Sequence, residues 1–450
     1  MNEIRTPSPK PIVVIICPPE DGHTRPLLPH ATHLIKQGYV VHFIGGVNFE
    51  EAIRSTGATY HHVPSVLTAE QFQQQQALEG PAQFIFGIKH NFIDLTPVAM
   101  KALQRVLETI REENPEREVV ILQEFVSMAV WPFLLGAPLP KGYNRFPKVI
   151  TLSTVPLTVS SIDTAPFGPG LPPDSSDEGR NRNAAMYQAM EGIGAELIAY
   201  ADAVYSDLGA TSRIPTKVLM DFWATGADLL LQPCSPSLEY PRSDLSPKIR
   251  FIGAMPPPPL AATIALPAWW GELVAAKQAT PPKKVVFVTQ GTFILDYRML
   301  LIPTIQALAG NDQYLVVAVL GKKGAALDDD VKLPENAKVV DYLSYDAILP
   351  YADVFVTNGG YGGFLHGVMH GVPMVIAGTG QDKAEVSMRG EWAGIAANLR
   401  SNTPSIEDIR EGVTKVIGDD RFKRRCLAIK QENEDLACFA QVERYINEIV

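Results

Sequence analysis

The chain has 450 residues, enough for two domains with separate cores, and its hydrophobic fraction of 46% is ordinary for a globular protein. A formal net charge of −10 without an extended Lys/Arg tract argues against nucleic acid or an anionic membrane as a partner. The longest apolar stretch, residues 125–139, contains two prolines and is too short to cross a bilayer. Four scattered cysteines and a polar N-terminus that is unlike a signal peptide predict a cytoplasmic protein.

The N-terminal segment predicts a strand–loop–helix–strand unit. Residues 11–17, PIVVIIC, form the continuous apolar run of a buried parallel strand, and Gly22-His23-x-x-Pro26 lies in the loop that follows. A lone loop histidine is more often structural than catalytic. His23, however, follows the carboxyl end of the first strand, where doubly wound sheets bind their ligands, and this position favours a functional role.

Residues 119–123 predict another strand, and Glu124 stands at its carboxyl end. A helix is expected over residues 125–135, so Glu124 also fits a simple helix-N-terminal charge favoured by the helix dipole. The two interpretations remain open at this point. Further on, residues 166–182 are rich in Pro, Gly, Ser and Asp and predict a mobile loop of the kind that gates a cleft.

Prolines between residues 256 and 282 mark the clearest linker of the chain. We therefore expect an N-terminal domain over residues 1–240, a Pro-rich linker over 241–283, a second domain over 284–425 and a C-terminal helix over 426–450.

The second domain is predicted to open with a strand over residues 285–288, which ends at Thr289-Gln290-Gly291-Thr292. A hydroxyl beside bare backbone N–H groups suits a phosphate oxygen, although Thr292 as an ordinary helix cap is the alternative. Strands over 314–320 and 338–340 follow, and Tyr342 comes directly after the second of these.

Residues 354–382 carry the clearest functional pattern. An apolar strand over 354–357 ends at Asn358-Gly359-Gly360-Tyr361-Gly362-Gly363, a helix closes at Gly371, and the next strand leads to Asp382. Glycines at a helix start expose backbone N–H groups to which the helix dipole adds partial positive charge, and this predicts a diphosphate site. A tight structural turn is the alternative, but Asp382 at the carboxyl end of the next strand favours the binding site.

This stretch resembles the nucleotide-sugar signature of inverting UDP-glycosyltransferases of the GT-B fold, which runs Thr-His-Gly-Gly-x-x-Ser, then Glu, then Gly-Val-Pro, then Asp-Gln. The matching positions are Thr357, Gly359, Gly360, Gly371, Val372, Pro373 and Asp382. The departures are Asn358 at the usual His, Gly363 at the usual Ser, His366 at the usual Glu and Lys383 at the usual Gln.

The resemblance implies an α/β architecture of two Rossmann-like, doubly wound parallel-sheet domains that face a cleft. The first domain would bind the acceptor, with residues 60–110 along its pocket or simply covering the sheet, and the last helix would cross back onto it. The implied donor-binding residues are Gln290, Gly291, Thr292, Tyr342, Asn358, Gly359, Gly360, Gly362, Gly363, His366, Asp382 and Lys383. Tyr342 would stack on the base, and Asp382 would accept hydrogen bonds from the sugar.

The same resemblance implies the chemistry. His23 would be the general base, oriented by Glu124 or, if the strand register is shifted by one, by Gln123. The enzyme would move a hexose, with glucose as first choice, from a UDP-sugar to a hydroxyl of an apolar small molecule such as a phenol, polyketide or terpenoid. A dTDP-sugar is the alternative donor. The alternatives are a nucleotide-sugar epimerase or hydrolase on the same fold, and a non-catalytic nucleotide-sugar-binding partner protein.

We expect no metal and no cofactor besides the sugar nucleotide. The run Asp328-Asp329-Asp330 lies away from any predicted strand end and fits a solvated acidic turn better than a metal site. A monomer or weak dimer without membrane insertion is expected.

Overall fold

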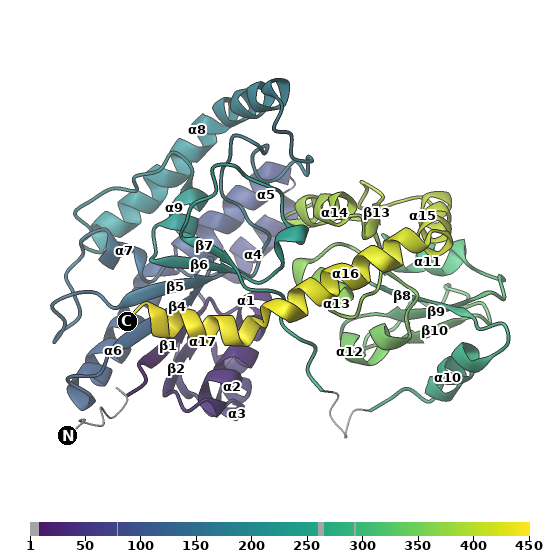
Figure 1. Cartoon of the computed structure of the whole chain (residues 1–450), viewed down its shortest axis with the longest axis horizontal. Helices are drawn as coiled ribbons and strands as arrows, with labels where there is room; N and C mark the ends of the chain where they lie inside the picture. Colours follow the sequence, from purple (N-terminus) through teal and green to yellow (C-terminus); the bar gives the residue numbers. More distant parts are fainter. Residues whose placement is uncertain (1–8, 79, 260–264, 292–293) are drawn as a thin grey trace, which may run out of the picture.

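The computed structural model describes residues 9–78, 80–259, 265–291 and 294–450, which form two α/β lobes, seen side by side in Figure 1. The first lobe is built on a seven-stranded sheet in the order β3-β2-β1-β4-β5-β6-β7, and every strand pair in it is parallel. Its strands are β1 (Ile12–Ile16), β2 (Val41–Gly45), β3 (Thr59–His62), β4 (Val119–Glu124), β5 (Lys148–Leu152), β6 (Leu229–Gln232) and β7 (Ile249–Phe251).

The second lobe repeats this plan with six parallel strands in the order β10-β9-β8-β11-β12-β13. Its strands are β8 (Lys284–Thr289), β9 (Tyr314–Val319), β10 (Ala337–Val340), β11 (Val354–Thr357), β12 (Met374–Ile376) and β13 (Ala396–Asn398). Both sheets are apolar on both faces because helices cover each side, which is why their strands are continuous apolar runs. The expected pair of doubly wound sheets is thereby confirmed.

The helices of the first lobe are α1 (Asp21–Thr24), α2 (Leu28–Lys36), α3 (Glu50–Ser55), α4 (Ala69–Ala77), α5 (Gly80–Gly87), a π-helical turn (Ile88–Ile93), α6 (Thr96–Glu113), α7 (Trp131–Leu134), α8 (Asp177–Asp207) and α9 (Leu219–Thr225). Those of the second lobe are α10 (Trp270–Gln278), α11 (Leu301–Ala307), α12 (Tyr345–Ile348), α13 (Tyr361–Met369), α14 (Lys383–Trp392) and α15 (Ile406–Gly418). No helix of the described residues is both long and apolar enough to cross a membrane.

Two local expectations were wrong. The helix expected over 125–135 is only the four-residue α7, because the segment after Glu124 turns back and Val126 N–H donates to the Glu124 carboxylate. The predicted loop over 166–182 ends early, because Ser176 accepts the Gly179 N–H at 3.1 Å and starts α8 at Asp177.

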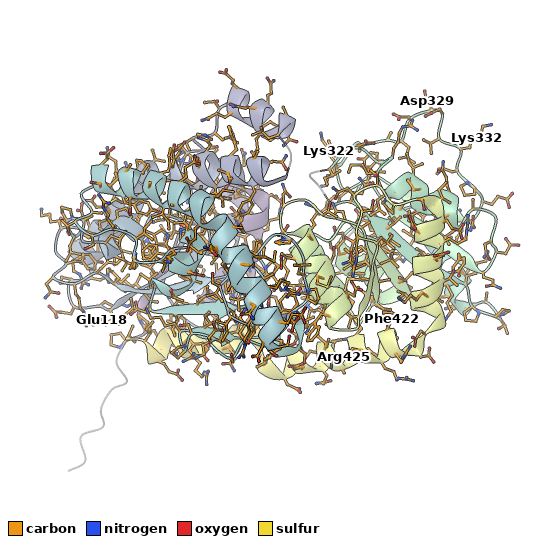
Figure 2. All side chains as sticks on the ribbon, turned by 90° about the horizontal axis from the view of Figure 1, so that it is seen from above. Glu118, Lys322, Asp329, Lys332, Phe422 and Arg425 are labelled. Atoms are coloured by element: carbon orange, nitrogen blue, oxygen red, sulfur yellow. The ribbon has the colours of Figure 1, made fainter. Side chains whose placement is uncertain are left out.

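The last two helices join the lobes. α16 (Asp420–Leu436) packs Cys426 and Ile429 into the core of the second lobe, and Ala437 then takes a left-handed conformation. α17 (Cys438–Glu448) packs Val442 and Ile446 against the first sheet. Figure 1 shows this pair as a yellow rod along both lobes, and Figure 2 shows Phe422 and Arg425 of α16 beside the second lobe.

Candidate active site

His23 and Glu124 meet at the carboxyl edge of the first sheet. β1 and β4 are adjacent and in register, with Ile16 paired to Gln123, so the loop after β1 and the end of β4 lie together. The His23 Nδ1 atom is 2.9 Å from Glu124 Oε1. The Glu124 carboxylate is fully buried and its other oxygen accepts the Val126 N–H at 2.9 Å, so it holds the imidazole from a fixed position.

The residue beside Glu124 faces the opposite side of the sheet. The Gln123 amide donates to Thr151 Oγ1 at 3.0 Å and makes no contact with the imidazole. Thr154, just beyond β5, was not expected at the site; its hydroxyl donates to Glu124 Oε1 and lies 3.3 Å from His23 Nδ1. A polar residue after the strand next to Glu124 is the signal by which it could have been found.

The surroundings set the proton affinity of His23. Burial alone would lower its pKa, but the Glu124 carboxylate, with smaller contributions from Glu20 and Asp382, raises the pKa above its ordinary value. Burial also raises the pKa of Glu20 to about 7. Among the described residues none forms a hydrogen bond with His23 Nε2, so the second nitrogen is the one open to a ligand.

The Phe92 side chain forms an apolar wall beside the His23 imidazole. It lies in the π-helical turn and meets His23 edge-on, with ring centroids 5.4 Å apart. At least this part of residues 60–110 therefore lines the site instead of only covering the sheet.

The glycine turn of the second lobe has the backbone expected for anion binding. Gly359 has φ +80°, and a Cβ there would lie 2.8 Å from the Ile376 side chain, so only glycine fits. A Cβ on Gly360 or Gly362 would meet nothing within 4 Å, so both face open space at the start of α13. The first N–H groups of this nine-residue helix have no intrahelical acceptor, which leaves them for a ligand.

Several predicted donor residues brace the turn. The Asn358 amide donates to the Gln290 carbonyl at 2.6 Å. The buried Gln290 amide accepts hydrogen bonds from the N–H groups of Leu300 and Leu301 and donates one to the Asp296 carbonyl. Its hydrogen bonds therefore stabilise the loop that follows β8. Gly291 has φ +74° and open space around it, and Thr292 lies outside the described residues.

Two further predicted residues flank the turn on α14. Asp382 occupies the N-cap position of this helix without a side-chain capping hydrogen bond. It is half-buried and close enough to His23 for each charge to act on the pKa of the other. The Lys383 ammonium donates to Gln381 Oε1 at 2.7 Å, and burial lowers its pKa.

Tyr342 lies just after β10 of the second lobe. The residue is 49% exposed, and the Lys323 ammonium lies 5.6 Å from the ring centre. An exposed aromatic face of this kind can stack on a planar base.

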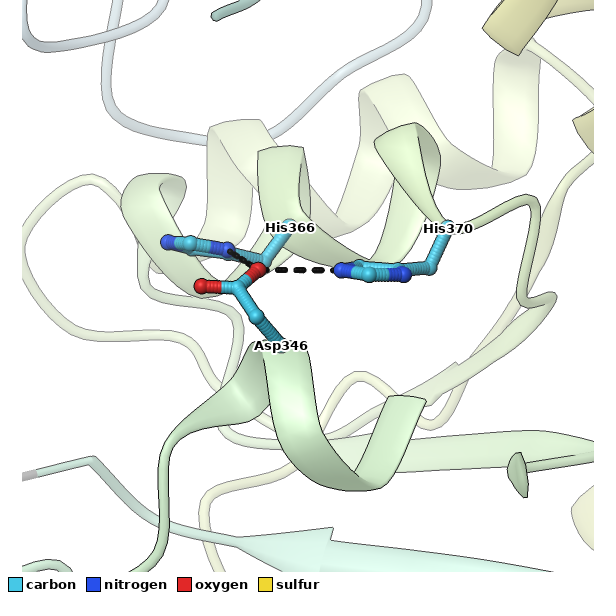
Figure 3. Close-up of side chains that lie close together, drawn as sticks. All are labelled: Asp346, His366 and His370. Atoms are coloured by element: carbon cyan, nitrogen blue, oxygen red, sulfur yellow. Dashed lines mark hydrogen bonds and ion pairs between the residues drawn. The ribbon is translucent and has the colours of Figure 1, made fainter. Parts of the chain in front are cut away.

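His366 belongs to a cluster that sequence reasoning missed. His366 Nδ1 and His370 Nε2 lie 3.1 and 2.9 Å from the same oxygen of Asp346, as Figure 3 shows. Burial alone would raise the Asp346 pKa, but these two hydrogen bonds hold it well below its ordinary range. The four-residue spacing of two histidines on a helix was the available signal.

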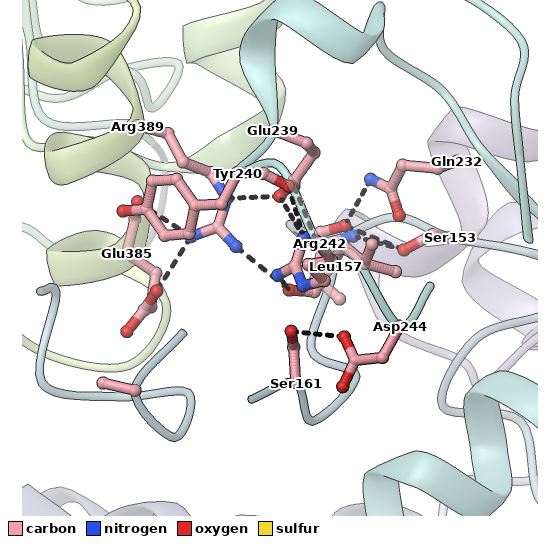
Figure 4. A network of polar contacts seen from close by, with 12 residues as sticks. Ser153, Leu157, Ser161, Gln232, Glu239, Tyr240, Arg242, Asp244, Glu385 and Arg389 are labelled. Carbon is pink, nitrogen blue, oxygen red and sulfur yellow. Dashed lines mark hydrogen bonds and ion pairs between the residues drawn. The ribbon is translucent and has the colours of Figure 1, made fainter. Parts of the chain in front are cut away.

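A buried ion network fixes the two lobes at the cleft (Figure 4). Arg389 of α14 is 1% exposed and reaches into the first lobe, 2.9 Å from Glu239 and 3.0 Å from the Leu157 carbonyl. Glu385 binds the same guanidinium at 2.8 Å and accepts the N–H groups of Gly168 and Gly170 at 2.8 and 2.9 Å. The loop over residues 166–182, which was expected to be mobile, is thus hydrogen-bonded to the second lobe at these two glycines.

Two doubly wound sheets with an imidazole on one edge and an open glycine turn on the other define the GT-B class of glycosyltransferases. Solved structures share this fold: a glycotransferase of kitacinnamycin matches with a TM-score of 0.70 at 19% identity over 98% of this chain and 99% of that one. The spinosyn rhamnosyltransferase SpnG complexed with thymidine diphosphate matches with a TM-score of 0.64 at 17% identity, over 97% and 100% of the two chains.

Sequence relatives narrow the class. UDP-glucosyltransferase 1 of Beauveria bassiana (strain ARSEF 2860) is 41% identical over 96% of this chain and 94% of its own length. UDP-glucosyltransferase A1 of Starmerella bombicola is 33% identical over 98% and 92%. Residues 303–449 match the family described as erythromycin biosynthesis protein CIII-like, C-terminal domain. The chain belongs to the UDP-glycosyltransferase family and is a UDP-dependent enzyme of that family.

Proposed function

We propose that the enzyme transfers glucose from UDP-glucose, with inversion at the anomeric carbon, to a hydroxyl of an apolar small molecule. The observation that carries this proposal is the His23–Glu124 pair, in which the second imidazole nitrogen has no hydrogen-bond partner among the described residues and the charge of Asp382 acts on the ring. The two relatives named above support the donor, since both are called UDP-glucosyltransferases. A further relative is the 4'-demethylrebeccamycin synthase of Lentzea aerocolonigenes, 34% identical over 93% of this chain and 95% of its own length.

The acceptor hydroxyl is a weak nucleophile at neutral pH, so it needs a base. His23 Nε2 takes the hydroxyl proton while the oxygen attacks the anomeric carbon. The bond from that carbon to the diphosphate oxygen breaks, and its electron pair leaves with UDP. Glu124 keeps the Nδ1 proton in place and stabilises the imidazolium, as a carboxylate does in a catalytic triad.

The leaving diphosphate gains negative charge. The N–H groups at the start of α13, with the positive end of the helix dipole, meet that charge without reorganisation. Asp382 accepts hydrogen bonds from sugar hydroxyls beside His23, and Tyr342 stacks on uracil. In this scheme the transfer itself needs no metal.

The phenolic, polyketide or terpenoid character of the acceptor is supported by Phe92, which places an aromatic edge beside the base. We expect acceptors whose hydroxyl adjoins an apolar ring or chain, because such a body gains free energy by burial against this wall.

The test begins with donor binding, measured by thermal shift with UDP-glucose, UDP-galactose, UDP-N-acetylglucosamine and dTDP-glucose. A donor at 100 times its dissociation constant adds about 2.7 kcal/mol of stability. Product analysis with a phenol panel then follows glycoside formation and its anomeric configuration by NMR. A β-glucoside from the α-linked donor supports the proposal. Isomerised UDP-sugar without acceptor, or binding without turnover, contradicts it.

A further inference from the structure

We propose that Asp346, His366 and His370 form a binding site for one divalent transition-metal ion of the zinc class. Among the described residues these three make up the one group of three or more His, Cys, Asp or Glu side chains whose ligand atoms all lie within 4.8 Å of one another. The site lies wholly in the second lobe, on α12, on α13 and at the C-cap of α13. It shares His366 with the donor-binding residues that the resemblance implies, but no step of the transfer proposed above uses the cluster.

The local fold explains why the three side chains converge. His366 and His370 are four residues apart, so helical geometry turns both to the same face of α13. Asp346 comes from the first turn of α12, which packs against that face. Figure 3 shows the two rings on opposite sides of one carboxylate oxygen, both with a nitrogen aimed at it.

The donor set is that of a zinc-type site. Two imidazoles and one carboxylate are the ligands of many three-ligand zinc centres, which keep a fourth position for water. Tetrahedral zinc at about 2.0–2.1 Å from its ligands sets neighbouring ligand atoms about 3.3 Å apart. The two observed N···O distances, 3.1 and 2.9 Å, are a few tenths of an ångström shorter. The carboxylate oxygen therefore needs to move only slightly away from the two nitrogens to make room for the ion.

The two nitrogens need the larger adjustment, since they are up to 4.8 Å apart. His366 can make it, because its side chain is 40% exposed, whereas those of His370 and Asp346 are only 12% and 8% exposed. The buried pair therefore forms the fixed part of the site, and His366 closes it from the solvent side. Tyr345, whose ring meets His366 edge-on at 5.5 Å, limits the directions in which it swings.

Calorimetric titration of the chelator-treated full-length protein with ZnCl₂ tests the proposal. We expect one site per chain with a dissociation constant on the order of 1 µM or tighter. His366→Ala, an exposed change that leaves the core intact, should weaken binding by about 10-fold or more, and His370→Ala by a similar or larger factor. Titration with Co²⁺ should give visible absorption bands that both substitutions remove.

The matched control is His61→Ala. His61 lies 2.9 Å from His42 on the first lobe, so this pair also offers two imidazoles but lacks the carboxylate. Zinc affinity unchanged in His61→Ala and lost in His366→Ala supports the site. Absence of binding to the unaltered protein, or equal loss in the control, overturns it and leaves a hydrogen-bonded cluster only. Because the readout is metal binding, failure of the glycosyl-transfer proposal would not affect the result.

Discussion

Two buried charge clusters lie at the facing edges of the lobes, and they are built for opposite purposes. The Arg389 guanidinium is surrounded by Glu239, Glu385 and a backbone carbonyl, with the Tyr240 ring 4.4 Å away, so it is held from several sides. Its Nη atoms donate hydrogen bonds, whereas its Nε contacts Glu239 through charge alone. The His23 imidazole is held on one nitrogen alone, by Glu124 and Thr154. A cluster held from several sides can join two lobes, whereas an imidazole held on one nitrogen keeps the other nitrogen for chemistry.

The largest expected effect comes from breaking the Arg389 cluster. Arg389→Met leaves the Glu385 carboxylate buried without its cation and leaves Glu239 with Arg242 alone, 3.5 Å away. Removing one partner of a buried pair costs about 3–5 kcal/mol. Urea denaturation followed by fluorescence measures the change in the free energy of unfolding.

Arg400→Met is the matched control, because Arg400 pairs with Glu391 at 2.9 Å on the surface, with 57% of its side chain exposed. An exposed pair contributes about 0–1 kcal/mol. Equal destabilisation by the two substitutions would mean that burial of the Arg389 cluster adds nothing to stability.

The next largest effect comes from removing the His23 imidazole. His23→Ala should lower the turnover number on the order of 10²-fold or more, because no other described group would take the acceptor proton. Its unfolding free energy should change much less than that of Arg389→Met, since the lost contacts are few. Initial rates with saturating donor, alongside the urea midpoint of the same protein, separate the two effects. Initial rates equal to those of the unaltered enzyme would remove the general-base role.

The strands and the residues at their ends could be predicted from the sequence. Apolar runs such as residues 11–17 and 354–357 predict buried parallel strands, and both sheets are correctly expected. His23 and Glu124 could be paired because each follows a strand, and adjacent strand ends meet at one edge. A site made from strand ends is readable when each end carries a chemically distinctive residue.

Contacts between lobes were beyond such reasoning. Arg389 and Glu239 are 150 positions apart, and neither stands in a motif, so only the packing of α14 on the first lobe brings them together. Gln290 and Asn358 illustrate a second difficulty: both lie in the donor loops, yet their side chains contact backbone groups, because a loop that presents its amides to a ligand must itself be held. The resemblance could place them at the site but could not give their orientation.

The smallest expected effect tests how Glu124 acts on the base. In Glu124→Gln the amide oxygen can still accept a hydrogen bond from the His23 Nδ1–H, but the negative charge that raises the pKa of His23 is gone. His23 works as a base only when neutral, so activity rises with pH through its pKa. The rising limb of the kcat/KM profile should therefore move to lower pH, with a plateau lowered roughly 10-fold or more because the imidazolium formed in the reaction loses its counter-charge. Asp163→Asn, which removes a carboxylate bound to Ser243 and Arg180 away from the base, should leave the limb in place. A limb that stays fixed in Glu124→Gln as well would mean that the carboxylate positions the ring without tuning its proton affinity.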